Sequence, residues 1–423
     1  MSPSGSGGES GTYVPPKSQG KMIGILVAVL VVTNLVTGVA VYYLTAPPAT
    51  TAPLKVIGPW SGPEQAAFLP IMDLFTRTTG IEYEYIQERQ EVLTTQLPTL
   101  FAAGQTPGDV IFMPSAFIKN AGAQGHASDL AGTISESSYA PGALDPLKNG
   151  SAIYGGAYTG KVKPGFWYRQ SFFQDNGLSV PTTWAEFETL LADIDAIPGI
   201  SNAIISGDGV GWPLSDVTEH FIATYGGPAM HRGLTAGTTA WTSTPVRDVF
   251  ANFLVPTLSA GYWSTPVQWD TGVQSWWNGT YGLYFMGSWI TGMVSDPSDL
   301  GVFSLPEAPG AEGIVFAADY FFAPRYSTRQ ADARSLAAFL ASAAAQTMQV
   351  RQGGHLATVL GVSLTAYPVV DAEVAGLLSG KDILSDLDDT VGGTFQTTLW
   401  SQLQLLWSDP AQLDSVLAAI EAA

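Results

Sequence analysis

Residues 165–191 read GFWYRQSFFQDNGLSVPTTWAEFETLL, an aromatic run followed by a turn and the start of a helix. Pro181 cannot lie inside the helix, because it lacks a backbone N–H and its ring clashes with the preceding turn. Thr183 and Glu186 form the pattern of a capping box, in which both side chains bond to free backbone N–H groups at a helix start. The stretch therefore predicts a turn at Pro181 and a helix over Trp184–Ala196.

The chain before this stretch alternates short apolar segments with helical ones. Such an alternation predicts an α/β fold with a parallel sheet. Ser61 and Glu64 form a second capping-box pattern, and the helix that follows ends at Gly80. The predicted strands are 54–60, 81–87 and 108–114, and the predicted helices are 61–79 and 91–103. Ligands of parallel sheets lie beyond the carboxyl ends of the strands, which are Trp60–Gly62 and Met113–Ser115 here.

Two further phrases follow in order, GTYGLYFMGSW at 279–289 and LPEAPG at 305–310. Together with 165–191 they resemble the extracellular solute-binding proteins of sugar ABC importers, family 1, which are similar to maltose- and glucose-binding proteins. The resemblance implies the two-lobed periplasmic-binding-protein fold of type II, the Venus-flytrap, with three segments crossing the hinge. It also suggests the membrane-anchored archaeal type.

The same resemblance predicts that neither lobe is continuous in sequence. Residues 54–161 and 318–355 should form the N-terminal lobe, and 162–317 and 356–423 the C-terminal lobe. Helices are expected over 216–225 and, packed back on the first lobe, over 334–352. Hinge closure around a ligand is a known mode of domain motion.

The composition excludes several classes of protein. Only 13% of the 423 residues are charged and the formal net charge is −19, with 17 basic residues, against about 25% charged in typical domains. Nucleic-acid binding needs clustered Lys and Arg, so it is not expected. The chain has no cysteine, which rules out disulfides, thiolate chemistry and a lipid-modified cysteine anchor.

The N-terminal region predicts a membrane anchor. Residues 22–44 carry no charge, and a helix of that length spans about 35 Å against a hydrocarbon core of about 30 Å. Lys17 and Lys21 place the disordered tail 1–21 in the cytoplasm by the positive-inside rule. Residues 45–53 then form a Pro/Thr linker to a domain outside the cell. In the alternative, 1–21 is the n-region of a cleaved signal peptide.

Sugars offer hydroxyl groups and apolar ring faces, so their sites need carboxylates, amides and flat aromatic rings. The resemblance implies that Trp289 stacks on the sugar. Five of the candidates also have a structural alternative: a lobe-core position for Trp289, packing beside Pro59 for Trp60, and capping for Glu64, Asp216 and Asp319. The predicted ligand-binding residues are Trp60, Glu64, Ser115, Asp216, Glu219, Trp289, Asp319 and Tyr320.

No catalytic residue, metal site or cofactor is predicted, because no metal-ligand spacing such as H-E-x-x-H occurs. Asn149 and Asn278 open glycosylation sequons. We expect a receptor, not an enzyme, that captures a neutral mono- or oligosaccharide and delivers it to the permease subunits of an ABC importer. The alternatives are a receptor for a polyamine or a peptide and, ranked lower, a surface glycoside hydrolase with paired carboxylates.

Overall fold

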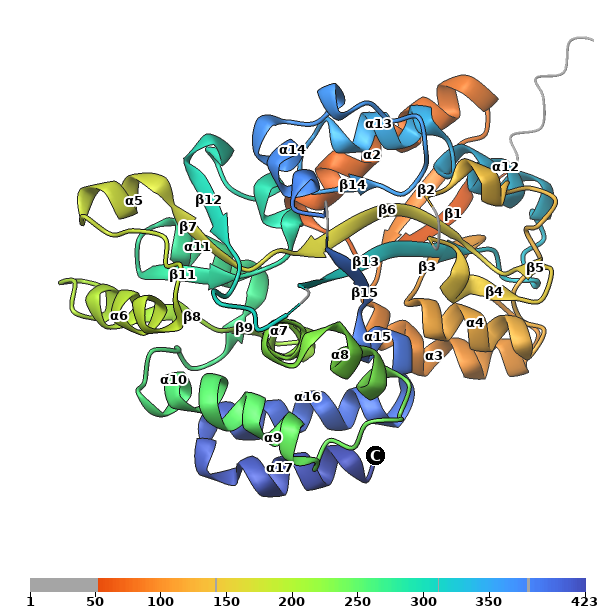
Figure 1. Cartoon of the computed structure of the whole chain (residues 1–423). Coiled ribbons are helices and arrows are strands. Elements are labelled where there is room, and N and C mark those ends of the chain that lie inside the picture. Colours follow the sequence, from red (N-terminus) through yellow and green to blue (C-terminus); the bar gives the residue numbers. More distant parts are fainter. Residues whose placement is uncertain (1–51, 141–142, 311, 379–380) are drawn as a thin grey trace, which may run out of the picture. The chain divides into compact units, whose positions relative to one another are not determined.

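The computed structural model describes residues 52–140, 143–310, 312–378 and 381–423. The predicted tail, the predicted anchor 22–44 and all but the last two residues of the linker lie outside this part of the chain. No helix within the described residues is both long and apolar enough to cross a membrane. Residues Pro53–Ala423 form one contact unit, which is described below (Figure 1).

The first lobe is built on the predicted parallel strands. β1 (Leu54–Gly58) pairs in parallel with both β2 (Tyr83–Gln87) and β3 (Val110–Phe112). The connecting helices are α2 (Gly62–Thr79) and α3 (Gln90–Ala102). Gly80 ends α2 in the left-handed conformation that glycine adopts without strain. These predicted strands and helices are confirmed to within a few residues.

The two predicted capping boxes differ. Thr183 begins α6 (Trp184–Asp195) with both reciprocal bonds of the box. Ser61 precedes α2 without a side-chain capping bond. The Glu64 carboxylate instead lies 3.7 Å from the Nζ atom of Lys161. A tertiary ion pair has therefore replaced the second local motif.

Long strands carry the chain between the lobes. β6 (Gly156–Lys163) and β13 (Gly313–Phe322) are antiparallel neighbours, and Figure 1 shows both running out of the first sheet toward the second. β14 (Leu356–Ala357) pairs with β6, and β15 (Asp382–Ser385) pairs in parallel with the start of β13. The strand order of this sheet is β14-β6-β13-β3-β1-β2, with β15 beside β13.

The second lobe has its own mixed sheet, in the order β12-β7-β11-β8. Its strands are β7 (Phe166–Arg169), β8 (Asn202–Ile205), β11 (Tyr281–Phe285) and β12 (Leu300–Phe303). α6, α7 (Trp212–Phe221) and α16 (Gly393–Ser408) pack into one core with this sheet, so the C-terminal helices belong to the second lobe.

Two predicted helices are corrected. The helix expected over 216–225 begins four residues earlier, as α7, and continues into the π-helical turn Ile222–Gly226. The helix expected over 334–352 is two helices, α12 (Gln330–Leu340) and α13 (Ala343–Val350). The Ser342 hydroxyl accepts a bond from the backbone N–H of Ala345 and starts the second one.

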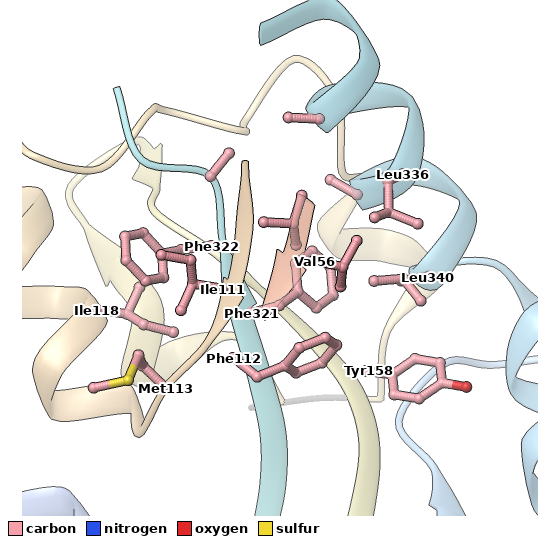
Figure 2. Close-up of a cluster of buried hydrophobic side chains, with 14 of the residues drawn as sticks. Val56, Ile111, Phe112, Met113, Ile118, Tyr158, Phe321, Phe322, Leu336 and Leu340 are labelled. Atoms are coloured by element: carbon pink, nitrogen blue, oxygen red, sulfur yellow. The ribbon is translucent and has the colours of Figure 1, made fainter. Parts of the chain in front are cut away.

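The core of the first lobe lies between its sheet and the helices on either face. Figure 2 shows side chains from β1, β3 and β13 meeting those of α12. Phe321 and Phe112 pack edge to face at 5.8 Å, and Val56, Leu336 and Leu340 are fully buried. A rigid core under the carboxyl ends of these strands fixes the loops that follow them.

Further elements complete the two lobes. The helices are α4 (Ser115–Ala123), α5 (Gln170–Asp175), α8 (Gly227–Thr235), α9 (Thr244–Val249), α10 (Val255–Ser259), α11 (Trp269–Trp277), α14 (Val369–Gly376), α15 (Leu387–Val391) and α17 (Leu413–Glu421). The short strands are β4 (Lys148–Asn149), β5 (Ala152–Ile153), β9 (Gly207–Asp208) and β10 (Val267–Gln268).

Candidate ligand-binding site

A cavity of about 510 Å³ lies at the carboxyl ends of the first sheet's strands, facing the second lobe. On the first-lobe side it is lined by residues that directly follow β1, β2 and β3, including Trp60, Arg89 and Met113. This is the position that the strand order predicts for a ligand. The crossing strands contribute Lys161 and Asp319.

Three tryptophans from the second lobe form one wall of the cavity. Trp212 opens α7, Trp269 opens α11, and Trp289 lies in a 3₁₀ turn (Ser288–Gly292) after β11. The ring of Trp212 meets those of Trp269 and Trp289 edge-on, at 5.3 and 5.5 Å. Trp212 and Trp269 are half-buried, whereas Trp289 is 5% exposed. Trp212 and Trp269 therefore offer the more accessible aromatic surface.

Trp60 and Trp400 also line the cavity, in different ways. Trp60 is 3% exposed and packs 4.6 Å from both Phe68 and Phe112, so most of its ring belongs to the first-lobe core. Trp400, on α16, is half-buried and its Nε1 atom donates to the Asp388 carboxylate at 2.5 Å.

Lys161 is the centre of a charged group at the hinge. Its Nζ atom lies 3.2 Å from Asp319 and 3.7 Å from Glu64. Burial alone would lower the pKa of Lys161, but the two carboxylates raise it above its ordinary value. Burial raises the pKa of Glu64, and Lys161 opposes this rise. Burial, with Lys161, lowers the pKa of His355 to about 4, so its ring is neutral near pH 7.

Lys163, two residues along the same strand, holds a second charged group, which extends from the cavity lining into the second lobe. Its ammonium bonds to Asp216 and, at 2.6 Å, to Asp386. On the next turn of α7, Glu219 accepts a bond from the backbone N–H of Leu387 at 3.0 Å and contacts His231 at 2.9 Å. These bonds tie α7 to the segment that follows β15.

The structure brings four of the eight predicted ligand residues together on the cavity lining: Trp60, Glu64, Trp289 and Asp319. The other four lie behind it. Ser115 is the buried first residue of α4, and Tyr320 packs against the first-lobe core.

Asp216 and Glu219 do not line the cavity either. Asp216 does not cap α7 but lies inside it, paired with Lys163, and both carboxylates are buried within the second lobe. The two predicted glycosylation sites, Asn149 and Asn278, are exposed.

Sequence reasoning missed much of the lining. The additional residues include Lys161, Lys163, Trp212, Gln268, Trp269, Asp270, Asp386, Asp388, Asp389, Gln396 and Trp400. Two features of the sequence pointed to part of this missed lining. Lys161-Val162-Lys163 places two scarce cations on one face of a strand. Trp269 directly follows the short strand β10, and Trp212 comes four residues after the end of β9.

Two lobes joined by crossing strands, with a cavity between them, form the architecture of a receptor that closes on a small molecule. Residues 59–347 match the bacterial extracellular solute-binding protein family. The chain belongs to this family. It is 46% identical over 369 residues to an uncharacterized ABC transporter extracellular-binding protein of Pyrococcus horikoshii, covering 87% of each chain.

Solved structures share the fold of this solute-binding protein at low sequence identity. A bacterial solute receptor, AcbH, described as exclusive for β-D-galactopyranose, superposes with a TM-score of 0.78 at 17% identity, covering 88% of this chain and 97% of its own. A chitin oligosaccharide binding protein superposes with a TM-score of 0.75 at 21% identity, covering 88% and 98%. The chain is thus the solute-binding component of an ABC transporter, in a family of receptors, not enzymes.

Proposed function

We propose that this receptor captures a neutral sugar, a mono- or oligosaccharide, in the cavity between its lobes and delivers it to an ABC permease. The observation that carries the proposal is the tryptophan wall of Trp212, Trp269 and Trp289 beside the polar side chains of Gln268 and Asp270. Both solved relatives described above are named for sugar ligands.

The wall matches the chemistry of a sugar. A pyranose presents apolar C–H faces, for which the half-buried rings of Trp212 and Trp269 offer flat partners. Its hydroxyl groups need acceptors and donors, which Asp270, Gln268 and Gln396 supply around the same cavity. Among the cavity cations, Lys161 and Lys163 are each paired with carboxylates, which disfavours anionic sugars.

One observation supports a second candidate, a receptor for a polyamine. Carboxylates on the lining outnumber cations by seven to three. The carboxylates are Glu64, Glu91, Asp270, Asp319, Asp386, Asp388 and Asp389, and the cations are Arg89, Lys161 and Lys163. A cationic ligand would gain from this excess, and its ammonium groups would also find cation–π partners in the tryptophan rings. The tryptophan wall therefore fits both candidates, and a binding measurement has to separate them.

Calorimetry on the full chain separates these candidates. A neutral mono- or disaccharide should bind with a dissociation constant near micromolar, or about −8 kcal/mol, while spermidine and a short neutral peptide should not bind. If spermidine binds and no sugar does, the receptor is one for a polyamine and the sugar proposal is wrong. Release of a cleaved product from a disaccharide would instead indicate a hydrolase.

The proposal includes anchoring of the receptor at the cell surface through residues 22–44, which lie outside the described residues. The uncharged span and its flanking Lys17 and Lys21 support this orientation. Protease added to intact cells should remove the lobes and leave an N-terminal fragment in the membrane. Recovery of the native protein from the medium with a cleaved N-terminus would overturn the anchor.

A further inference from the structure

The cavity extends beyond the tryptophan wall along one face of α16. Four residues of this helix line it: Gly393, Gln396, Thr397 and Trp400. Residues three, four and seven positions apart lie on the same side of a helix. From Gly393 to Trp400 the helix rises about 10 Å. The lining therefore has a second part, whose polar side chains on α16 are a neutral amide and a hydroxyl group.

Trp400 carries the aromatic surface of this second part. Its ring lies against the backbone of Gly211, where a Cβ atom would come within 2.5 Å of the ring. Gly211 directly precedes Trp212 in the chain, so Trp400 is a neighbour of the tryptophan wall. Trp400 is half-buried and lines the cavity, which leaves part of its ring for a ligand.

The loop that joins β9 to α7 keeps two aromatic surfaces apart. Gly209 borders the side chain of Gln268, the residue before Trp269. Gly211, two residues further on, borders Trp400. These contacts place Trp269 and Trp400 at different points along the loop. A ligand that contacts both rings must therefore be longer than a ligand that contacts one.

Hydrogen bonds fix the position of Trp400. Its Nε1 atom donates to Asp388 at 2.5 Å. One turn later on α16, Gln404 donates to Asp208 at 2.7 Å, and Asp208 also accepts from the backbone N–H of Gly211 at 2.9 Å. These bonds tie α16 to the loop under the ring. A ring that is already held in place loses little conformational freedom when a ligand stacks on it.

The dimensions of the site favour a ligand of more than one sugar ring. The ring centre of Trp212 lies 5.3 and 5.5 Å from those of the other two rings of the wall, a width that suits one pyranose. The whole cavity measures about 510 Å³, within the range of about 300–1,000 Å³ for sites that enclose a drug-sized ligand. A single hexose is smaller than such a ligand and would leave the Trp400 side of the cavity to water.

We infer that the solute is an oligosaccharide of at least two units, with one unit on the tryptophan wall and the next on Trp400. This inference rests on the proposed function and specifies the length of its ligand. Trp400 is then a specificity-determining residue, because its ring covers an apolar face of the second unit. Gln396 and Thr397, on the same helix face, bond to the hydroxyl groups of that unit. A monosaccharide gains from the wall alone.

Calorimetry on the full chain with sugars of rising length tests the inference. The probes are glucose, maltose and maltotriose, with parallel series built on xylose and on N-acetylglucosamine. In the series that binds, the disaccharide should bind at least roughly tenfold more tightly than its monosaccharide. Trp400→Ala should remove most of that advantage, because it weakens binding of the disaccharide far more than binding of the monosaccharide. Leu405→Ala is the matched control: this residue is 40% exposed on the same helix, outside the cavity lining, and its truncation should leave the advantage unchanged.

A second variant separates stacking from a structural role of Trp400. Trp400→Phe keeps an aromatic face but has no N–H to donate to Asp388, so it should keep most of the advantage of the disaccharide. A loss as large as that of Trp400→Ala would show that the bond to Asp388 is what matters, and it would overturn the stacking role.

Failure of this inference can be told from failure of the proposed function. A monosaccharide that binds as tightly as its disaccharide, or a Trp400→Ala variant that weakens binding of both equally, overturns the length preference but leaves a sugar receptor. If no sugar of any length binds, the proposed function fails and this inference fails with it. The comparison of sugar lengths on the wild type decides the matter even if Trp400→Ala does not fold.

Discussion

The ammonium group of Lys161 lies 5.1 Å from the ring centre of Trp289. Lys161 belongs to a strand that crosses between the lobes, and Trp289 belongs to the second lobe. The contact is a cation–π interaction, and it is joined by the bond from Lys161 to Asp319 on the other crossing strand. Much of the Trp289 ring is therefore occupied by protein.

Trp289→Ala should destabilise the fold. The side chain is 5% exposed, belongs to a buried cluster, and packs so close to Gly287 that a Cβ atom there would come within 1.8 Å of the ring. Truncation of such a tryptophan costs about 3–5 kcal/mol. Urea unfolding should show the loss. An unchanged midpoint together with lost sugar binding would instead make Trp289 chiefly a ligand contact.

Trp269→Ala should mainly weaken sugar binding. Its ring is half-buried and lines the cavity, so truncation removes stacking and buried apolar area worth about 2 kcal/mol, or roughly 30-fold in affinity. Trp277→Ala is the matched control, because Trp277 is also half-buried but bonds to Ser295 away from the cavity. If both variants bind the sugar with equal affinity, Trp269 does not contact the ligand.

Much of the fold was predictable because local signals agree with tertiary structure. The capping box at Thr183 formed, since α6 starts at the surface with no competing partner for Glu186. The box at Ser61 did not form, because Glu64 is drawn to Lys161, which is distant in sequence.

The site was less predictable, because contacts between segments that are distant in sequence place most of its residues. Strand ends indicated where Trp60 would lie, because strand direction fixes the ligand edge of a sheet. Asp319 lies inside the crossing strand β13, and only the family resemblance pointed to it. Nothing local shows that Asp216 pairs with Lys163, or that the segment from Asp386 onward closes the cavity. Those contacts depend on how crossing strands bring separate segments together.

Lys163→Met should cost about 3–5 kcal/mol of stability, because it leaves Asp216 and Asp386 buried without their counter-charge. Adding Asp216→Asn should recover part of the loss. Lys148→Met, which breaks an ion pair with the exposed Glu136, should leave the unfolding curve unchanged. Denaturant unfolding in EDTA measures all three variants. A small loss for Lys163→Met would mean that the buried carboxylates carry protons instead.

His355 should make the fold less stable in acid. Burial, followed by the charge of Lys161, lowers the pKa of its imidazole from 6.5 to about 4. Between pH 6.5 and 4 the unfolded chain therefore takes up a proton that the folded chain refuses, so this contribution to stability is present above pH 6.5 and is lost as the pH falls. For this residue, which is 5% exposed, the pKa difference between the unfolded and folded states is worth about 3 kcal/mol of unfolding free energy in full.

The unfolding free energies of wild type and His355→Gln should be compared at pH 7 and pH 4.5. This comparison isolates the contribution of His355 from that of the buried carboxylates, which titrate in both proteins. The variant should lose less stability on acidification than the wild type. Parallel pH profiles would show that the His355 ring is protonated in the folded state, paired with Asp319 at 3.7 Å.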